Sequence, residues 1–184
     1  REMGDLLRVS IGKNVRLDYQ LSERLPSLNA DVSQLRQVVM NLITNASEAI
    51  GESSGTVRIS TDSIWADRRM LSSIYIDHEL VSGKYVVLQV SDTGCGMDEQ
   101  TRTRLFDPFF TTKFTGRGLG LAAVLGIIRG HLGAIRVDSE VGKGTTFTVF
   151  FPAFEDRESS SVTTERPPVE YEGHGTILVI DDEE

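Results

Sequence analysis

Near its middle the chain reads Phe106-Asp107-Pro108-Phe109-Phe110-Thr111-Thr112-Lys113-Phe114-Thr115-Gly116-Arg117-Gly118-Leu119-Gly120, which is its most informative stretch. Its three glycines at alternate positions let the backbone approach a ligand closely and adopt positive φ angles. An apolar segment follows, which we expect to form a buried helix from about Gly118 to Leu132. The N–H groups and the positive dipole end at the start of such a helix favour a bound phosphate. The stretch therefore predicts a phosphate site, and the aromatic residues before it predict a mobile flap with an apolar underside.

The composition limits the class of protein. The chain has 184 residues, of which 39% are hydrophobic and 25% charged, so we expect one main core with a second fragment at its end. No apolar run approaches the length of about 18 residues that a membrane helix requires. Cys95 is the single cysteine, which rules out a disulfide framework and fits a reducing, cytoplasmic compartment. The net charge of −8 argues against nucleic acid as the main partner.

Periodicity and turn residues predict the remaining elements. Asp31 is a suitable N-cap for a long helix that ends near Ile50, before Gly51, and its apolar residues recur at helical spacing. We expect a second, short helix over 98–105. We expect strands over 15–21, 56–65, 84–91, 134–138 and 145–151, with 66–83 as an extended hairpin connection.

The two ends of the chain differ in character from the middle. Residues 1–14 look like the end of a helix and a connector. Residues 153–175 are rich in Ser, Thr, Glu and Pro, cannot bury a core, and predict a flexible linker. Residues 176–180 form a last apolar strand, followed by Asp181 and Asp182, that we assign to the start of another domain.

The long helix carries a polar stripe beside its apolar one. Asn41, Asn45 and Glu48 lie at positions i, i+4 and i+7. A solvated helix face explains this pattern, and so do amide oxygens directed at a hydrated Mg²⁺. The helix alone does not decide between the two interpretations.

Two glycine turns follow strands. In Asp92-Thr93-Gly94-Cys95-Gly96 a strand delivers a carboxylate, which can accept a hydrogen bond from the exocyclic amine of adenine and so favours adenine over guanine. A tight turn with an Asx hydrogen bond is the alternative. The run Gly142-Lys143-Gly144-Thr145-Thr146, taken alone, predicts a plain β-turn.

Other nucleotide motifs are absent or misplaced. The sequence contains no Gly-x-x-x-x-Gly-Lys-[Ser/Thr], which excludes a P-loop. Gly118-x-Gly120-x-x-Ala123 matches the loose dinucleotide fingerprint, but no strand precedes it. The three histidines, His78, His131 and His174, show neither metal-ligand nor triad spacing.

Taken in order, five short motifs resemble the ATP-binding catalytic domain of bacterial sensor histidine kinases, a member of the GHKL superfamily. The resemblance covers residues 15–152. It rests on Asn41-Leu42-Ile43-Thr44-Asn45-Ala46, Asp92-Thr93-Gly94-Cys95-Gly96, Phe106-Asp107-Pro108-Phe109-Phe110, Gly116-Arg117-Gly118-Leu119-Gly120-Leu121 and Gly142-Lys143-Gly144-Thr145.

The resemblance implies an α+β fold, a two-layer α/β sandwich of the Bergerat type in which a mixed sheet packs on helices. It implies ATP and Mg²⁺ as cofactors, with the nucleotide held between the helices under a lid from about Phe106 to Gly118. Asn45 would ligate Mg²⁺ with help from Asn41. Asp92 would bind the adenine amine, supported through water by Thr146. The implied ATP-binding residues are Asn41, Asn45, Asp92, Gly94, Gly96, Lys113, Gly116, Arg117, Gly118, Leu119, Gly120 and Thr146.

Two of these implied contacts concern the γ-phosphate. Lys113 and Arg117 are the basic candidates, because both lie on the implied lid. Glu48 departs from the family pattern, in which many members have a basic residue that can touch phosphate at this position. The resemblance therefore leaves open whether position 48 of the long helix contacts phosphate.

The implied function is transfer of the ATP γ-phosphate to a histidine on a dimerisation domain that precedes the ATP-binding domain. None of the three histidines has the His-Glu/Asp-x-x-x-Pro surroundings of that acceptor. The tail resembles the first strand of a receiver domain, with Asp181 and Asp182 as its acidic pair, so the parent would be a hybrid kinase.

Several consequences for partners follow from this interpretation. We expect a homodimeric parent, whose membrane attachment stays open, and a monomeric chain. We expect a response regulator or receiver domain downstream, and no nucleic acid. A non-catalytic ATP-sensing module is the alternative function, and another GHKL ATPase or a serine-directed kinase is a further one.

Overall fold

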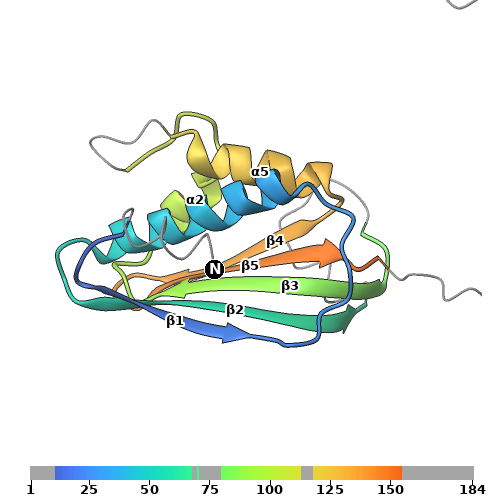
Figure 1. The fold of residues 1–184 in the computed structure, drawn as a ribbon. Coiled ribbons are helices and arrows are strands. Elements are labelled where there is room, and N and C mark those ends of the chain that lie inside the picture. Colours follow the sequence, from blue (N-terminus) through green and yellow to red (C-terminus); the bar gives the residue numbers. More distant parts are fainter. Residues whose placement is uncertain (1–10, 68–69, 71–79, 113–117, 155–184) are drawn as a thin grey trace, which may run out of the picture.

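A mixed sheet with the strand order β1-β2-β3-β5-β4 forms one layer of the molecule (Figure 1). The computed structural model describes residues 11–67, 70, 80–112 and 118–154. The strands are β1 (Val15–Leu21), β2 (Gly55–Ala66), β3 (Gly83–Asp92), β4 (Ala134–Glu140) and β5 (Gly144–Pro152). β1 pairs with β2 in parallel, and the other neighbours are antiparallel. The five strands expected between residues 15 and 151 are confirmed.

The helices form the second layer. They are α2 (Val32–Ile50), α4 (Glu99–Arg104) and α5 (Gly120–Gly130), and α2 and α5 lie on the same face of the sheet (Figure 1). This arrangement confirms the expected α+β sandwich with a mixed sheet. None of the helices in the described part of the chain combines the length and hydropathy needed to cross a bilayer.

Local signals at both ends set the limits of α2. Asp31 is its N-cap, and the Asp31 side chain accepts a hydrogen bond from the Gln34 N–H at 2.9 Å. Gly51 ends the helix with a φ of 64° and donates its N–H to the Ser47 carbonyl at 3.2 Å. One side of the helix is buried, at Val38, Leu42, Ile43, Ala46, Ser47 and Ile50.

Side chains alternate across the sheet and divide it into two faces. Val57, Val90, Phe147 and Val149 point to the helices and join α2 and α5 in the main core. Their strand neighbours face the other way, where a smaller cluster contains Ala66, Tyr85, Ala134 and Phe150.

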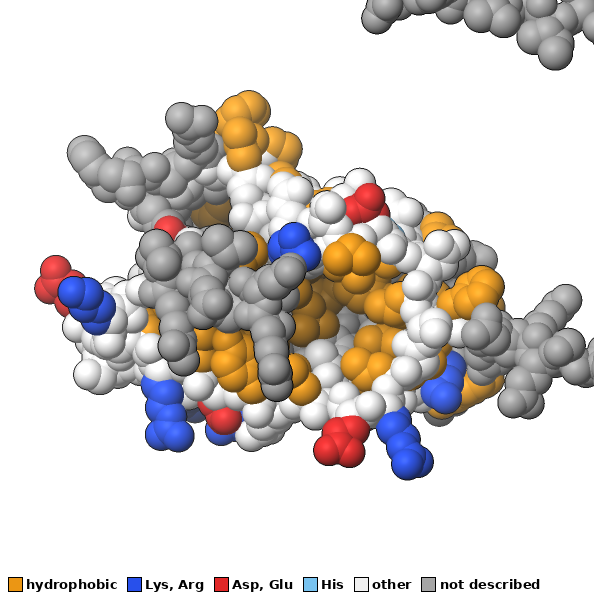
Figure 2. Space-filling model, viewed as in Figure 1, with side chains coloured by type: hydrophobic (Ala, Val, Ile, Leu, Met, Phe, Trp, Pro, Cys, Tyr) orange, Lys and Arg blue, Asp and Glu red, His pale blue; other side chains and the backbone are white. Residues whose placement is uncertain are grey.

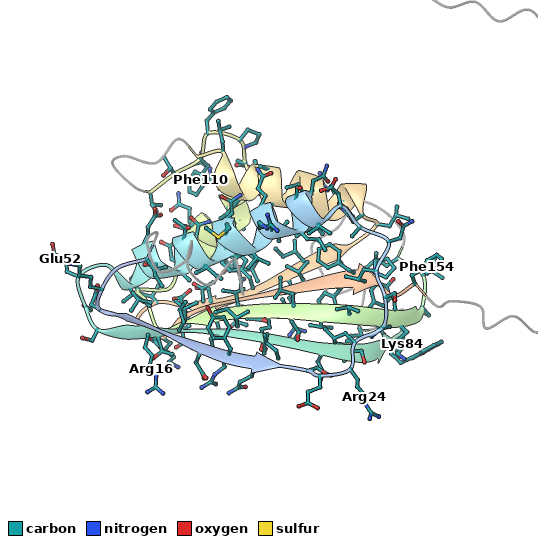
Figure 3. The ribbon with its side chains drawn as sticks, in the orientation of Figure 1. Arg16, Arg24, Glu52, Lys84, Phe110 and Phe154 are labelled. Carbon is teal, nitrogen blue, oxygen red and sulfur yellow. The ribbon has the colours of Figure 1, made fainter. Side chains whose placement is uncertain are left out.

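Two labelled arginines lie outside the layer between sheet and helices. Arg16 and Arg24 project away from the helices (Figure 3). On the face shown in Figure 2, Lys and Arg side chains lie mainly along the lower rim, and apolar side chains show between β1 and the helices.

The structure differs from the sequence prediction in α5, which begins at Gly120 rather than near Gly118. Gly118 has a φ of 67° and so cannot belong to a right-handed helix. The helix is also less buried than its apolar sequence suggests, because only Val124, Leu125 and Ile128 are fully covered. A single sheet covers one side of the helix, and Gly126 on another side is exposed.

Four expectations concern residues outside the described part of the chain. They are the helix end before residue 11, most of the connection between β2 and β3, the linker after residue 154, and the strand at 176–180 with Asp181 and Asp182. These remain predictions from the sequence.

Candidate functional site

A cavity of about 520 Å³ lies between the helices and one end of the sheet. Phe110, at its wall, lies at the end of the molecule opposite Lys84 and Phe154 (Figure 3). The described residues that line it come from five segments: 41, 44, 45, 48 and 49 of α2; 92 and 95–97; 101 and 105; 110–112 with 118–121; and 145 with 147. The described parts of all five motifs found in the sequence thus border this cavity or pack directly behind it.

The polar stripe of α2 faces the cavity. Asn41, Thr44, Asn45 and Glu48 all line it, while the opposite side of the helix is in the core. The start of α5 lies close to this stripe, since a Cβ added to Gly120 would lie 3.6 Å from the Asn41 Oδ1. The polar stripe therefore borders the cavity, where its side chains can reach a ligand.

Asp92 is held at the inner end of the cavity. It closes β3, is 5% exposed, and its Oδ1 accepts hydrogen bonds from the Gly94 N–H at 2.8 Å and the Thr145 N–H at 3.3 Å. Burial raises the pKa of the carboxyl group, and the two hydrogen bonds oppose that rise. Because both bonds use Oδ1, Oδ2 is the oxygen that can accept from a ligand.

Glycines let the loop after β3 pack closely on its surroundings. A Cβ on Gly94 would lie 2.6 Å from a backbone atom of Ala49, and one on Gly96 would lie 2.0 Å from the Glu140 carbonyl oxygen. Gly96 borders the cavity, whereas Gly94 acts behind it by donating to Asp92. The predicted Asx turn is thus present, and it orients the carboxylate.

The structure contradicts the expected role of Thr146. This residue does not line the cavity, and its Oγ1 bonds to the Ser91 Oγ at 2.8 Å on the sheet face away from the helices. Thr145 lines the cavity instead and contacts Asp92. The alternation of Thr145, Phe147 and Val149 toward the core is the sequence signal that identifies the correct residue.

A backbone hydrogen bond joins two residues near the two ends of the predicted lid. The Phe109 N–H donates to the Gly118 carbonyl at 2.9 Å. Gly118 and Leu119 line the cavity, as does Phe110, whose ring lies 4.5 Å from the Arg104 guanidinium. Lys113, Gly116 and Arg117 lie outside the described residues.

Apolar side chains form part of the cavity wall. Met97, Leu105 and Phe147 line the cavity, and no sequence motif singled them out as site residues. A flat apolar ligand group with one hydrogen-bond donor fits this combination of apolar wall and buried carboxylate.

Residues 30–155 match the family model described as histidine kinase-, DNA gyrase B- and HSP90-like ATPase. The chain belongs to this family and is an ATP-binding catalytic domain of the histidine kinase type.

Its relatives are sensor kinases. The chain is 37% identical over 189 residues to the sensor kinase CckA of Brucella abortus, a match that covers 97% of this chain and 20% of the relative. It is 39% identical over 143 residues to the signal transduction histidine-protein kinase AtoS of Escherichia coli, covering 77% of this chain and 21% of the relative. The chain therefore spans about a fifth of the length of these two relatives.

Solved structures show the same fold. The catalytic domain of histidine kinase ThkA, in a nucleotide-free form, aligns with a TM-score of 0.59 at 27% identity, covering 83% of this chain and 86% of that one. Full-length ShkA in complex with AMPPNP aligns with a TM-score of 0.63 at 28% identity, covering 83% of this chain and 29% of that one.

Proposed function

We propose that this chain is the catalytic part of a sensor histidine kinase and transfers the γ-phosphate of ATP to a histidine on a dimerisation domain outside the chain. One observation carries the proposal: a single cavity joins the Asn41 and Asn45 amides to the buried Asp92 carboxylate. The names of the relatives support the reaction type.

The adenine binds at the Asp92 end. Its exocyclic amine donates to the carboxylate, and its ring contacts the apolar wall of Met97, Leu105 and Phe147. Gly94 and Thr145 fix the direction of the carboxylate through their N–H groups. A site that is built to accept a hydrogen bond discriminates against bases that cannot donate one.

The other end fits a divalent cation with phosphate. Asn41 and Asn45 offer amide oxygens, which are suitable hard ligands for Mg²⁺. The described residues contain no group of three or more His, Cys, Asp or Glu side chains that could hold a metal. This donor set suits an ion that arrives with the nucleotide, and such an ion supplies charge neutralisation on the phosphates.

The start of α5 supplies N–H groups for the phosphates. Leu119 is the N-cap, and its apolar side chain does not accept a hydrogen bond from the N–H groups of the first turn. Gly118, Leu119 and Gly120 line the cavity at this point. In the proposal, Gly116, Lys113 and Arg117 extend the cradle toward the γ-phosphate.

The chain's own residues position ATP, and the nucleophile is supplied from outside. His131 is unsuited as the phosphoryl acceptor because both its ring nitrogens are engaged in hydrogen bonds. Nε2 accepts a hydrogen bond from the Asp31 N–H at 3.1 Å, and Nδ1 pairs with the Ile127 carbonyl at 2.8 Å. We propose that a histidine of the dimerisation domain attacks the γ-phosphate, with ADP as the leaving group.

We further propose a hybrid kinase with a receiver domain after the linker. The similarity to CckA covers 97% of the chain and so continues past residue 155, where the family match ends. Asp181 and Asp182 would belong to the acidic site of that domain. In this arrangement the parent is a homodimer, and a receiver or response regulator takes the phosphate onward.

The reaction is tested with the chain, labelled ATP and a dimerisation domain from a relative. We expect a phosphohistidine on the added domain and none on the chain. A chain that binds ATP in calorimetry but labels no supplied domain would instead be an ATP-sensing module.

A further inference from the structure

Ser139 lies behind the adenine end of the cavity, at a point where three segments meet. It is the last residue but one of β4, and it does not line the cavity. Its Oγ accepts from the Met97 N–H at 2.9 Å, lies 2.9 Å from the Thr145 Oγ1, and donates to the Gly144 carbonyl at 3.2 Å. Two of these three partners, Met97 and Thr145, line the same cavity as Asp92.

The three contacts use the full capacity of one hydroxyl group. A serine Oγ has two lone pairs and one proton. The Met97 N–H and the Thr145 hydroxyl can donate to the lone pairs, while the Ser139 proton goes to the Gly144 carbonyl. The buried Thr145 hydroxyl thereby obtains its partner from Ser139, and the backbone N–H of the same Thr145 holds Asp92.

Backbone contacts near Ser139 connect the same two parts of the chain. The Gly142 N–H donates to the Cys95 carbonyl at 2.8 Å, and the Gly96 α-carbon packs against the Glu140 carbonyl. These contacts bring the loop after β3 to the hairpin between β4 and β5. The Ser139 side chain adds hydrogen bonds that join the two.

We infer that Ser139 is a positioning residue for base selection. It sets the position of Met97 against the ring and, through Thr145, the position of the Asp92 carboxylate against the amine. The inference rests on the proposed binding of adenine by Asp92. Ser139 does not contact the ligand, yet it contributes part of the preference for adenine.

The test compares ATP with ITP, in which a carbonyl replaces the exocyclic amine, by calorimetry with Mg²⁺ on the whole chain. The variants are S139A, the milder S139C, D92N, and S91A as the matched control. Ser91 precedes Asp92, and its hydroxyl bonds to Thr146 on the opposite sheet face. Thermal unfolding without nucleotide is measured for each variant.

We expect the wild type to prefer ATP and S139A to reduce the ATP-to-ITP affinity ratio about tenfold, with a smaller loss in S139C. S91A should keep the ratio. General destabilisation lowers both affinities by the same factor, so it leaves the ratio unchanged. An unchanged ratio in S139A and S139C, together with a collapsed ratio in D92N, overturns the inference and leaves the proposed function intact. A wild type that does not distinguish ATP from ITP refutes the adenine assignment itself.

Discussion

Phe109 and Gly118 are joined by a hydrogen bond of 2.9 Å, from the Phe109 N–H to the Gly118 carbonyl, and both residues have a φ of 67°. A Cβ on Gly118 would lie 2.4 Å from the Phe109 carbonyl carbon. Glycine at position 118 therefore meets two requirements, a left-handed backbone and a close backbone contact. Phe109 meets the first of them at a cost, because it carries a side chain in the left-handed region.

Gly118→Ala should separate the two ends of this segment and disturb the start of α5. We expect a loss of about 1–3 kcal/mol in the free energy of unfolding, together with weaker ATP binding. Gly126→Ala is the control, since nothing lies within 4 Å of a Cβ at this exposed helical position. It should gain about 0.5–1 kcal/mol. Urea titration of both variants provides the comparison, and equal stabilities would contradict the packing argument.

Asn45→Ala should remove most of the Mg²⁺-dependent part of ATP binding, because the proposed metal loses an amide ligand. We expect the affinity measured by calorimetry to fall at least about tenfold with Mg²⁺ and to change little in EDTA. Gln37→Ala serves as control, since Gln37 is exposed on the same helix and does not line the cavity. Retained Mg²⁺ dependence in Asn45→Ala would refute the metal assignment.

Asp92→Asn should weaken ATP about tenfold or more, because an amide N–H₂ replaces the oxygen that accepts from the adenine amine. The fold should survive, since an amide oxygen can still accept from the Gly94 and Thr145 N–H groups. Isothermal titration together with a circular dichroism spectrum separates these two effects. Unchanged ATP affinity would exclude the adenine role.

The same variant should change how stability depends on pH. The pKa of Asp92 is raised in the native state, so between the unfolded pKa of about 3.9 and the native value the folded protein binds more protons. The wild type therefore loses stability from this group as pH rises through that interval. Asp92→Asn lacks this loss, and the difference in unfolding free energy should grow in its favour from about pH 4 upward. A difference that is constant with pH would contradict the burial effect.

Thr146→Val tests the corrected position of the threonine contact. Its hydroxyl bonds to Ser91 on the face away from the cavity, so ATP affinity should stay within about twofold of the wild type. A large loss of affinity in calorimetry would restore the role first expected for Thr146.

The parts of the fold with strong local signals could be predicted from the sequence. Asp31, Gly51 and the apolar stripe between them are sufficient to define α2, because capping and helical spacing act within one segment. The glycine motifs and the two asparagines likewise indicated one nucleotide site. Each of these signals is contained within one continuous segment of the chain.

The errors arose where position depends on contacts between segments. Thr145 and Thr146 differ only in which sheet face they occupy, and the pairing of β5 with β3 decides that. The true start of α5 depends on the backbone of Gly118 against Phe109. The hydroxyl of Ser139 gains its partners from two segments that are distant in sequence, so no local motif marks it.

The pairing of Asp92 with Thr145 also makes the cavity a measure of completed folding. Asp92 and Thr145 are 53 residues apart in the sequence, and the described cavity-lining residues run from 41 to 147. A nucleotide that contacts several of these segments binds only the fully assembled chain. It stabilises that state according to its concentration relative to its dissociation constant. ATP can therefore act as a folding ligand for this domain, selecting assembled molecules from those in which β5 has not yet joined the sheet.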